Sequence, residues 1–257
     1  MASDMSTPAP EPLHVAIIGA GITGVNLALG LQARGVSYTI YERAPCFGEI
    51  GAGIGFSPNA ERAMGALHPD VLAAFKRIAN PNGEDYFQWV DGHESGSLIF
   101  KLHVGKDGFQ GGRRSDILEA WANLIPPSSV RFGKELDTIT DRRPLTLHFK
   151  DGTTTHADAV IGCDGIRSRT RSLLTPSSLS EPTYTRKFCF RALAPLPRAI
   201  ATIGTAASTT RFMYNGPGAH VITYPVANNT LLNILAVLSD PSPIWPHPTH
   251  TLSLIHI

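Results

Sequence analysis

The hydrophobic pattern of the chain begins with a continuous apolar run, His14-Val-Ala-Ile-Ile18, that ends at a glycine. Such runs are typical of strands buried on both faces of a parallel sheet. A helical pattern over residues 22–34 follows and stops at Gly35, and a second strand-like run over residues 36–41 closes at Glu42. This order predicts a strand–turn–helix–strand unit with a right-handed crossover.

Helical and strand-like periods alternate from there to residue 174. The predicted helices cover residues 59–67, 71–79, 115–124 and 167–174, and Ser57 and Ser115 are the predicted N-caps of the first and third. The predicted strands cover residues 85–90, 98–104, 145–149 and 153–161. The turn Lys150-Asp151-Gly152 makes the last two strands a hairpin.

A Pro- and Ser-rich crossing at residues 175–182 separates this part from a mostly strand-forming one. The later strands are predicted over residues 187–193, 211–215, 219–224 and 231–238. Because the pattern changes from alternating helices and strands to strands alone, it predicts an α/β fold of two domains.

Composition narrows the range of partners. The 257 residues include 22 Lys and Arg against 21 Asp and Glu, so no strong field favours nucleic acid or anionic lipid. The three scattered cysteines predict neither a disulfide framework nor a zinc site, and no metal is expected. Residues 1–12 form a predicted disordered tail without signal-peptide features, and no run is long enough for a membrane span. A cytoplasmic protein is expected.

Gly19, Gly21 and Gly24 form a G-x-G-x-x-G between the first strand and the first helix. In order, they allow a tight turn, close approach of the backbone to a pyrophosphate, and close packing of helix on strand. The helix N-terminus favours phosphates, and Glu42 after the second strand can accept hydrogen bonds from a ribose. The unit indicates a dinucleotide site for FAD or NAD, with a glycine-lined packing turn and a solvated glutamate as the alternative.

Two later segments carry candidate polar contacts. Arg113 and Arg114 precede Ser115-Asp116 and can hold anionic or carbonyl oxygens, or form only a solvated basic pair. In the segment Gly162-Cys-Asp-Gly-Ile-Arg-Ser168, Asp164 can bond a ribose or ribityl hydroxyl, or simply cap the next helix. Each segment alone leaves both interpretations open.

Together these segments resemble the single-component FAD-dependent aromatic monooxygenases related to salicylate hydroxylase and para-hydroxybenzoate hydroxylase. The resemblance rests on the glycine motif with Tyr41-Glu42-Arg43, the loop Gly51-Ala-Gly-Ile-Gly-Phe-Ser-Pro-Asn59, Arg114-Ser-Asp116 and the segment 162–168, in that family's order over roughly residues 13–240. The loop followed by Pro58-Asn59 points to the salicylate hydroxylase branch. Cys163 stands where the family usually has alanine.

The resemblance implies an FAD/NAD(P)-binding Rossmann-like domain at residues 13–80 and 106–175 and a partial, β-rich substrate domain at residues 81–105 and 183–240. The implied cofactor-binding residues are Gly19, Gly21, Gly24, Glu42, Arg43, Gly53, Ile54, Arg114, Asp164 and Gly165. Catalytic residues stay unknown. His220, Tyr224 and Arg191 are substrate-pocket candidates, although a histidine or tyrosine in a strand is more often structural.

The implied activity is hydroxylation of a small, salicylate-like aromatic substrate with FAD as cofactor, NADH or NADPH as co-substrate, and O2, through a flavin hydroperoxide. One alternative is a flavoprotein oxidase or dehydrogenase with the same FAD domain. Another is a non-catalytic nucleotide-binding fragment. A plain NAD-dependent dehydrogenase leaves the second and third segments unexplained, and the oligomeric state is left open.

The end of the chain carries a separate expectation. Family members continue into a Gly-Asp-Ala motif and closing helices, and neither is found here, so the chain is expected to be truncated at its C-terminus. The final Leu252-Ser-Leu-Ile-His-Ile257 is what CTG-TCT-CTT-ATA-CAC-ATC encodes, a string that resembles the transposon end of sequencing-library adaptors. Residues 241–257 are expected to be a tail whose last six residues are adaptor-derived, with a genuine strand or a natural short isoform as alternatives.

Overall fold

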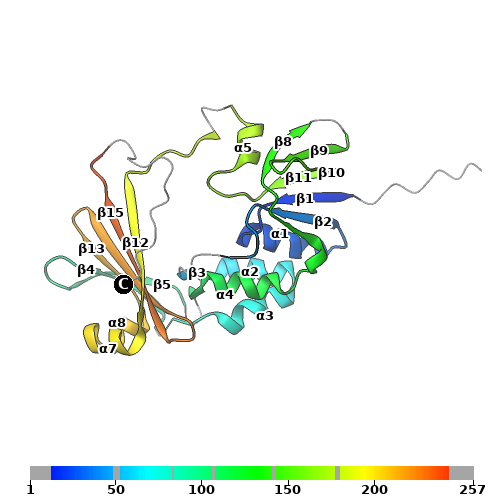
Figure 1. The fold of residues 1–257 in the computed structure, drawn as a ribbon. Helices are drawn as coiled ribbons and strands as arrows, with labels where there is room; N and C mark the ends of the chain where they lie inside the picture. The colour runs from blue at the N-terminus through cyan, green and yellow to red at the C-terminus, as the bar shows by residue number, and fades with distance from the viewer. Residues whose placement is uncertain are drawn as a thin grey trace, which may run out of the picture. The chain divides into compact units, whose positions relative to one another are not determined.

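The computed structural model describes residues 13–48, 53–82, 84–105, 108–140, 143–176 and 180–242. The predicted tail at residues 1–12 lies outside this description, as do residues 243–257 of the tail predicted over residues 241–257. The chain divides into two compact units: Met1–Phe47 with Leu124–Glu181, and Gly48–Asn123 with Pro182–Ile257. Figure 1 shows the helices and strands of both units.

The first unit is built on a parallel sheet with the strand order β11-β1-β2-β7. Its strands are β1 (His14–Ile18), β2 (Ser37–Glu42), β7 (Val130–Phe132, after the short 3-10 helix η1, Pro127–Ser129) and β11 (Ala159–Gly162). Helix α1 (Ile22–Gln32) joins β1 to its parallel neighbour β2, so the predicted strand–turn–helix–strand unit is confirmed. The apolar run of β1 is buried because this strand lies between two others.

A second, antiparallel sheet in this unit has the order β10-β9-β8. It contains β8 (Leu136–Thr140), β9 (Leu145–Phe149) and β10 (Thr154–Ala157), and the predicted hairpin turn joins β9 to β10. The prediction of one strand over residues 153–161 was wrong. Asp158 ends β10, because its backbone N–H donates to the His14 carbonyl and its carboxylate accepts from the His14 N–H at 2.8 Å, so the chain continues as β11 beside β1.

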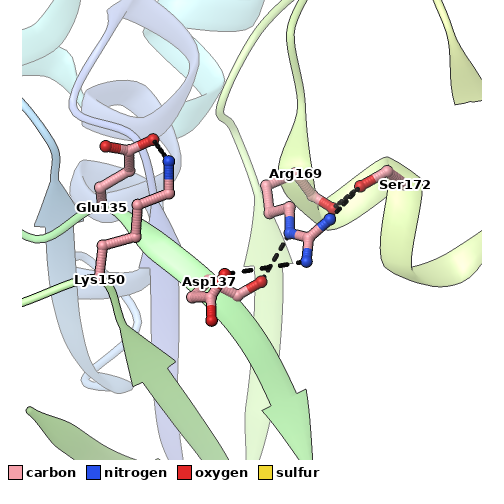
Figure 2. Close-up of polar contacts among 5 residues, drawn as sticks. All are labelled: Glu135, Asp137, Lys150, Arg169 and Ser172. Atoms are coloured by element: carbon pink, nitrogen blue, oxygen red, sulfur yellow. Dashed lines mark hydrogen bonds and ion pairs between the residues drawn. The ribbon is translucent and has the colours of Figure 1, made fainter. Parts of the chain in front are cut away.

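Helix α5 (Arg169–Leu174) follows β11 and is fixed to β8 (Figure 2). The Arg169 Nε donates to the Asp137 carbonyl oxygen at 2.6 Å, and its Nη1 lies 3.5 Å from the Ser172 hydroxyl oxygen. Beside this contact, the Lys150 ammonium pairs with the Glu135 carboxylate at 2.5 Å. These exposed contacts contribute little to stability individually, and the bond from Arg169 to Asp137 is the one that joins the start of α5 to β8.

The second unit contains a six-stranded sheet with the order β12-β15-β14-β13-β4-β5. Its strands are β4 (Tyr86–Asp91), β5 (Leu98–His103), β12 (Lys187–Pro195), β13 (Arg211–Gly216), β14 (Ala219–Val226) and β15 (Leu231–Ser239). All neighbours are antiparallel except β13 and β4. Each of these strands overlaps a predicted one.

Two helices in this unit, α7 (Leu196–Ile203) and α8 (Thr205–Thr209), were missed by the sequence analysis. The prolines at the start of α7 resemble a loop signal, yet proline is tolerated in the first helical turn, where its missing N–H has no intrahelical partner anyway. The apolar face of α7 then packs through Leu196 and Ala199 on Leu232 of β15.

The second unit also holds a two-stranded ribbon and three helices. These are β3 (Gly53–Phe56) paired antiparallel with β6 (Gln110–Arg113), and α2 (Pro58–Leu67), α3 (Pro69–Ile78) and α4 (Arg114–Ala122). Ser57 is the N-cap of α2 as predicted, but Ser115 is not a cap, because β6 runs directly into α4 and places the N-cap at Arg113. The buried Trp121 donates to the Val71 carbonyl oxygen at 3.0 Å and joins α4 to α3.

The ribbon and helices α2 to α4 thus belong to the same compact unit as the six-stranded sheet. The sequence interpretation places the same residues in the FAD-binding domain, and that functional assignment stays a prediction. In the ranges that the structure describes, no helix is both long enough and apolar enough to cross a membrane.

Candidate functional site

The turn between β1 and α1 brings two of the predicted glycines against each other and against Cys163. Gly19 has a φ of +102°, a region that favours glycine, and a β-carbon there would lie 2.6 Å from the Cys163 carbonyl oxygen. A β-carbon on Gly24 would lie 1.9 Å from the Gly19 carbonyl oxygen. Both glycines are therefore required by packing, as the motif predicts for close contact of helix and strand.

Gly21 is different, because apart from its chain neighbours no atom of the described residues lies within 4 Å of a β-carbon added there. It is the N-cap of α1, which has no side-chain cap and no acidic residue in its first turn. The N–H groups of that turn are thus available to an external acceptor, and the helix dipole favours an anion. This open space and these donors fit the pyrophosphate of FAD.

Glu42, at the end of β2, orders the same turn through its carboxylate. Its Oε2 accepts from the Ala20 N–H at 2.7 Å and its Oε1 from the Ala44 N–H at 2.8 Å. A carboxylate oxygen has a second lone pair, so a ribose hydroxyl can still donate to it. The structure therefore brings Glu42 to the glycine turn, while the neighbouring Arg43 is exposed.

Asp164, in the turn after β11, accepts hydrogen bonds from the start of helix α5, whose N-cap is Ser168. Its Oδ1 accepts from the Ser168 hydroxyl at 2.6 Å, and its Oδ2 accepts from the Thr170 N–H at 2.9 Å. Burial raises the pKa of Asp164, but these hydrogen bonds outweigh it and hold the pKa below its usual value. Gly165, with a φ of +76°, turns the chain. The structure shows Asp164 making these hydrogen bonds to the start of α5, and its contact with a cofactor stays a prediction.

Gly53 and Ile54 lie on β3, opposite Arg113 and Gly112 of β6. The Gly53 N–H donates to the side-chain oxygen of the buried Asn233 at 3.0 Å, which ties the ribbon to β15. Arg113 lies 3.7 Å from the Asp116 carboxylate, and the half-buried Arg114 is the first residue of α4. These predicted cofactor residues belong to the second unit, whereas the glycine turn, Glu42 and Asp164 belong to the first.

The substrate-pocket candidates share one face of the six-stranded sheet. Tyr224 stands opposite Asn233, and Arg191 and His220 stand opposite Leu235 and Val237 of the same strand. Because opposed residues share a face and every second residue repeats it, all three candidates point to the same side. His220 is four residues from Tyr224, roughly 13 Å along the strand.

Tyr224 is also close enough to two arginines to respond to their charge. Burial raises its pKa above the usual value, and the charges of Arg211 and Arg191 act in the opposite direction. Sequence reasoning missed the buried Arg211 and Asn233. The available signal was a charged or amide residue inside an otherwise apolar strand pattern.

No protein-family model matches the chain, whereas individual relatives do. An FAD-dependent monooxygenase of Monascus ruber is 50% identical over 249 residues, which covers 92% of this chain and 57% of the relative. Another, of Aspergillus niger, is 49% identical over 254 residues, with coverage of 92% and 58%. This chain is a homologue of FAD-dependent monooxygenases. A salicylate hydroxylase of Sarocladium schorii is 40% identical over 253 residues, with coverage of 92% and 52%. The chain thus spans less than two thirds of the length of these relatives.

Solved structures agree with the fold. A salicylate hydroxylase in a substrate complex has a TM-score of 0.78 and 28% identity, covering 95% of this chain and 60% of the other. HpxO of Klebsiella pneumoniae, complexed with FAD and uric acid, has a TM-score of 0.74 at 21% identity, with coverage of 90% and 58%, and shares the fold alone. The predicted α/β class, with a Rossmann-like unit and a β-rich unit, is confirmed over this part of the fold.

Proposed function

We propose that the protein binds FAD and hydroxylates a small, salicylate-like aromatic substrate, with NADH or NADPH and O2 as co-substrates, in the cytoplasm. The observation that carries the proposal is the opening at Gly21, where the N-terminus of α1 has no side-chain cap and, apart from the chain neighbours, no other described residue comes within 4 Å of an added β-carbon. The homologous monooxygenases support FAD as the group that fits there.

The glycine turn, Glu42, Asp164 and Arg114 each have a proposed task toward the cofactor. The turn from Gly19 to Gly24 and the first N–H groups of α1 hold the pyrophosphate, and Glu42 accepts from the adenosine ribose. Asp164 and Arg114 supply further polar contacts to the flavin chain. When bound, FAD supplies the activation of O2, which amino-acid side chains alone do not provide.

Arg191 and Tyr224 have a proposed task toward the substrate. A guanidinium and a phenol on one sheet face can orient the oxygen substituents of an aromatic ring, because both donate hydrogen bonds to anionic oxygen. Ile222 and Leu235, which stand opposite each other between these two residues, give the same face an apolar floor that excludes water.

The experiment starts from the purified chain and added FAD. Retained flavin absorbance after gel filtration, bleaching by NADH or NADPH without oxygen, and incorporation of heavy oxygen from labelled O2 into salicylate are the expected results. A chain that stays colourless would support the non-catalytic fragment. Flavin reduction followed by hydrogen peroxide without a hydroxylated product would support the oxidase alternative.

A matched pair of variants separates the two sites. Arg191→Met is expected to retain flavin and lose hydroxylated product, since Arg191 lies on the proposed substrate face of the six-stranded sheet, whereas Gly21→Ala is expected to lose flavin. Arg198→Met, on the exposed side of α7, is the control that changes an arginine without affecting either readout.

A further inference from the structure

Arg211 is a buried charge for which the proposed chemistry gives no use. Only 2% of its surface is exposed, and neither its Nε nor its Nη1 has a hydrogen-bond partner among the described residues. None of the ion pairs formed there includes it. A buried guanidinium without a carboxylate is unfavourable unless other groups replace its hydration. Burial accordingly lowers the pKa of Arg211 to about 10.

Among the described residues, two aromatic rings flank the Arg211 guanidinium and no carboxylate pairs with it. The guanidinium carbon lies 4.7 Å from the centre of the Phe109 ring and 5.2 Å from the centre of the Tyr224 ring. Ring faces attract cations, and they also accept weak hydrogen bonds from N–H groups. Arg211 therefore contacts both Phe109, which directly precedes β6 of the two-stranded ribbon, and Tyr224 of β14.

The backbone around Phe109 is strained to allow this contact. Phe109 has a φ of +60°, which a bulky side chain rarely adopts. A β-carbon on Gly55 would lie 2.6 Å from the Phe109 ring, and one on Gly111 would lie 3.3 Å from both Arg211 Nη atoms. Two glycines thus keep open the space that the ring and guanidinium fill. Strain of this kind gathers at functional sites, where the surroundings maintain it.

We propose that Arg211 is a positioning residue whose charge holds the Tyr224 phenol in place on the substrate face of the six-stranded sheet. The charged groups that face Tyr224 are Arg211 from β13 and Arg191 from β12, while Asn233 of β15 and Gly53 of β3 are uncharged. The task of Tyr224 toward substrate rests on the proposed function. The contact between Arg211 and Tyr224 does not rest on the proposed function. The positioning role of Arg211 and the proposed function can therefore be refuted independently.

The test is a pH titration of Tyr224 in the full 257-residue chain, without flavin or substrate. Labelling with 3-fluorotyrosine makes every phenol more acidic, which keeps the titration below alkaline denaturation, and fluorine NMR resolves the individual rings. The signal that disappears in Tyr224→Phe identifies residue 224. Arg211→Met removes the charge and keeps the length of the side chain, and Arg211→Lys restores the charge.

The expected result is that Arg211→Met shifts the Tyr224 midpoint to higher pH and that Arg211→Lys moves it back toward wild type. A midpoint that does not move in Arg211→Met would overturn the proposal, because a guanidinium that only fills space has no effect on phenol acidity. A shift that Arg211→Lys fails to reverse would overturn it as well. Should Arg211→Met not fold, the comparison of wild type with Arg211→Lys still tests it: equal midpoints support a role of charge, and a higher midpoint in Arg211→Lys contradicts it.

Discussion

Replacing each glycine of the first turn by alanine separates packing from cofactor binding. Gly24→Ala puts a methyl carbon 1.9 Å from the Gly19 carbonyl oxygen, far inside van der Waals contact. Overpacking costs about 1–3 kcal/mol or more, and the helix-propensity gain of alanine over glycine, about 1 kcal/mol, offsets only part of it. Because a 1.9 Å approach belongs at the upper end of this cost, we expect Gly24→Ala to lose about 2 kcal/mol of unfolding free energy, and FAD binding with it.

For Gly21→Ala we expect little change in stability, in contrast to Gly24→Ala. Apart from its chain neighbours, the β-carbon added at Gly21 meets no atom of the described residues within 4 Å, and the φ of −73° there suits any residue. Alanine is a poorer N-cap than glycine, but it also restricts the unfolded chain, so the net change is within about 1 kcal/mol. The methyl occupies the space assigned to the pyrophosphate, so we expect FAD affinity to fall by roughly 100-fold, equivalent to about 2.7 kcal/mol.

The assays are urea unfolding followed by circular dichroism and FAD titration followed by flavin fluorescence. Gly65→Ala in α2 is the matched control: its β-carbon makes ordinary contact at 3.4 Å, so stability should rise by up to about 1 kcal/mol with FAD affinity unchanged. Wild-type FAD affinity in Gly21→Ala would refute the binding argument. Wild-type stability in Gly24→Ala would refute the packing argument.

Three further predictions concern single contacts. Glu42→Gln cannot accept from both the Ala20 and Ala44 N–H groups. We therefore expect a loss of about 1–3 kcal/mol of unfolding free energy in urea and weaker binding in the FAD titration. Unchanged stability would contradict the role of these hydrogen bonds. Asp164→Asn should lower the melting temperature at pH 7. Because the folded pKa of Asp164 is lowered, its stabilisation is complete above its unfolded pKa and is lost as pH falls below about 4, so the gap to wild type should close there in a series of melts. Trp121→Phe removes the hydrogen bond to the Val71 carbonyl and should cost about 1–3 kcal/mol by urea unfolding, with FAD affinity as the readout that stays constant.

Local patterns were sufficient for the elements whose signals lie within a few residues of one another. The buried run of β1, the glycine turn and Gly35 predicted the strand–turn–helix–strand part of the first unit correctly. A strand flanked on both sides must be apolar throughout, and a helix readily ends near a residue with positive φ. The same holds for the hairpin at Lys150-Asp151-Gly152 and the strands of the six-stranded sheet.

Errors arose where a distant residue decided the outcome. Asp158 divides a continuous strand pattern because it bonds to His14, which is 144 positions away in sequence. Helix α7 forms at a proline-rich start because Leu232 and Ile234 of β15 cover its apolar face. Neither partner is visible in the local pattern.

For the candidate sites, the sequence by itself determined where a dinucleotide-binding turn can form, because the steric need for glycine in such a turn is local. Only the tertiary structure decided that Gly19 and Gly24 are needed for packing while Gly21 faces open space. It alone placed Arg191, His220 and Tyr224 on one sheet face and surrounded Arg211 with two rings. Strand register and burial arise from contacts between distant segments, and no pattern within one segment encodes them.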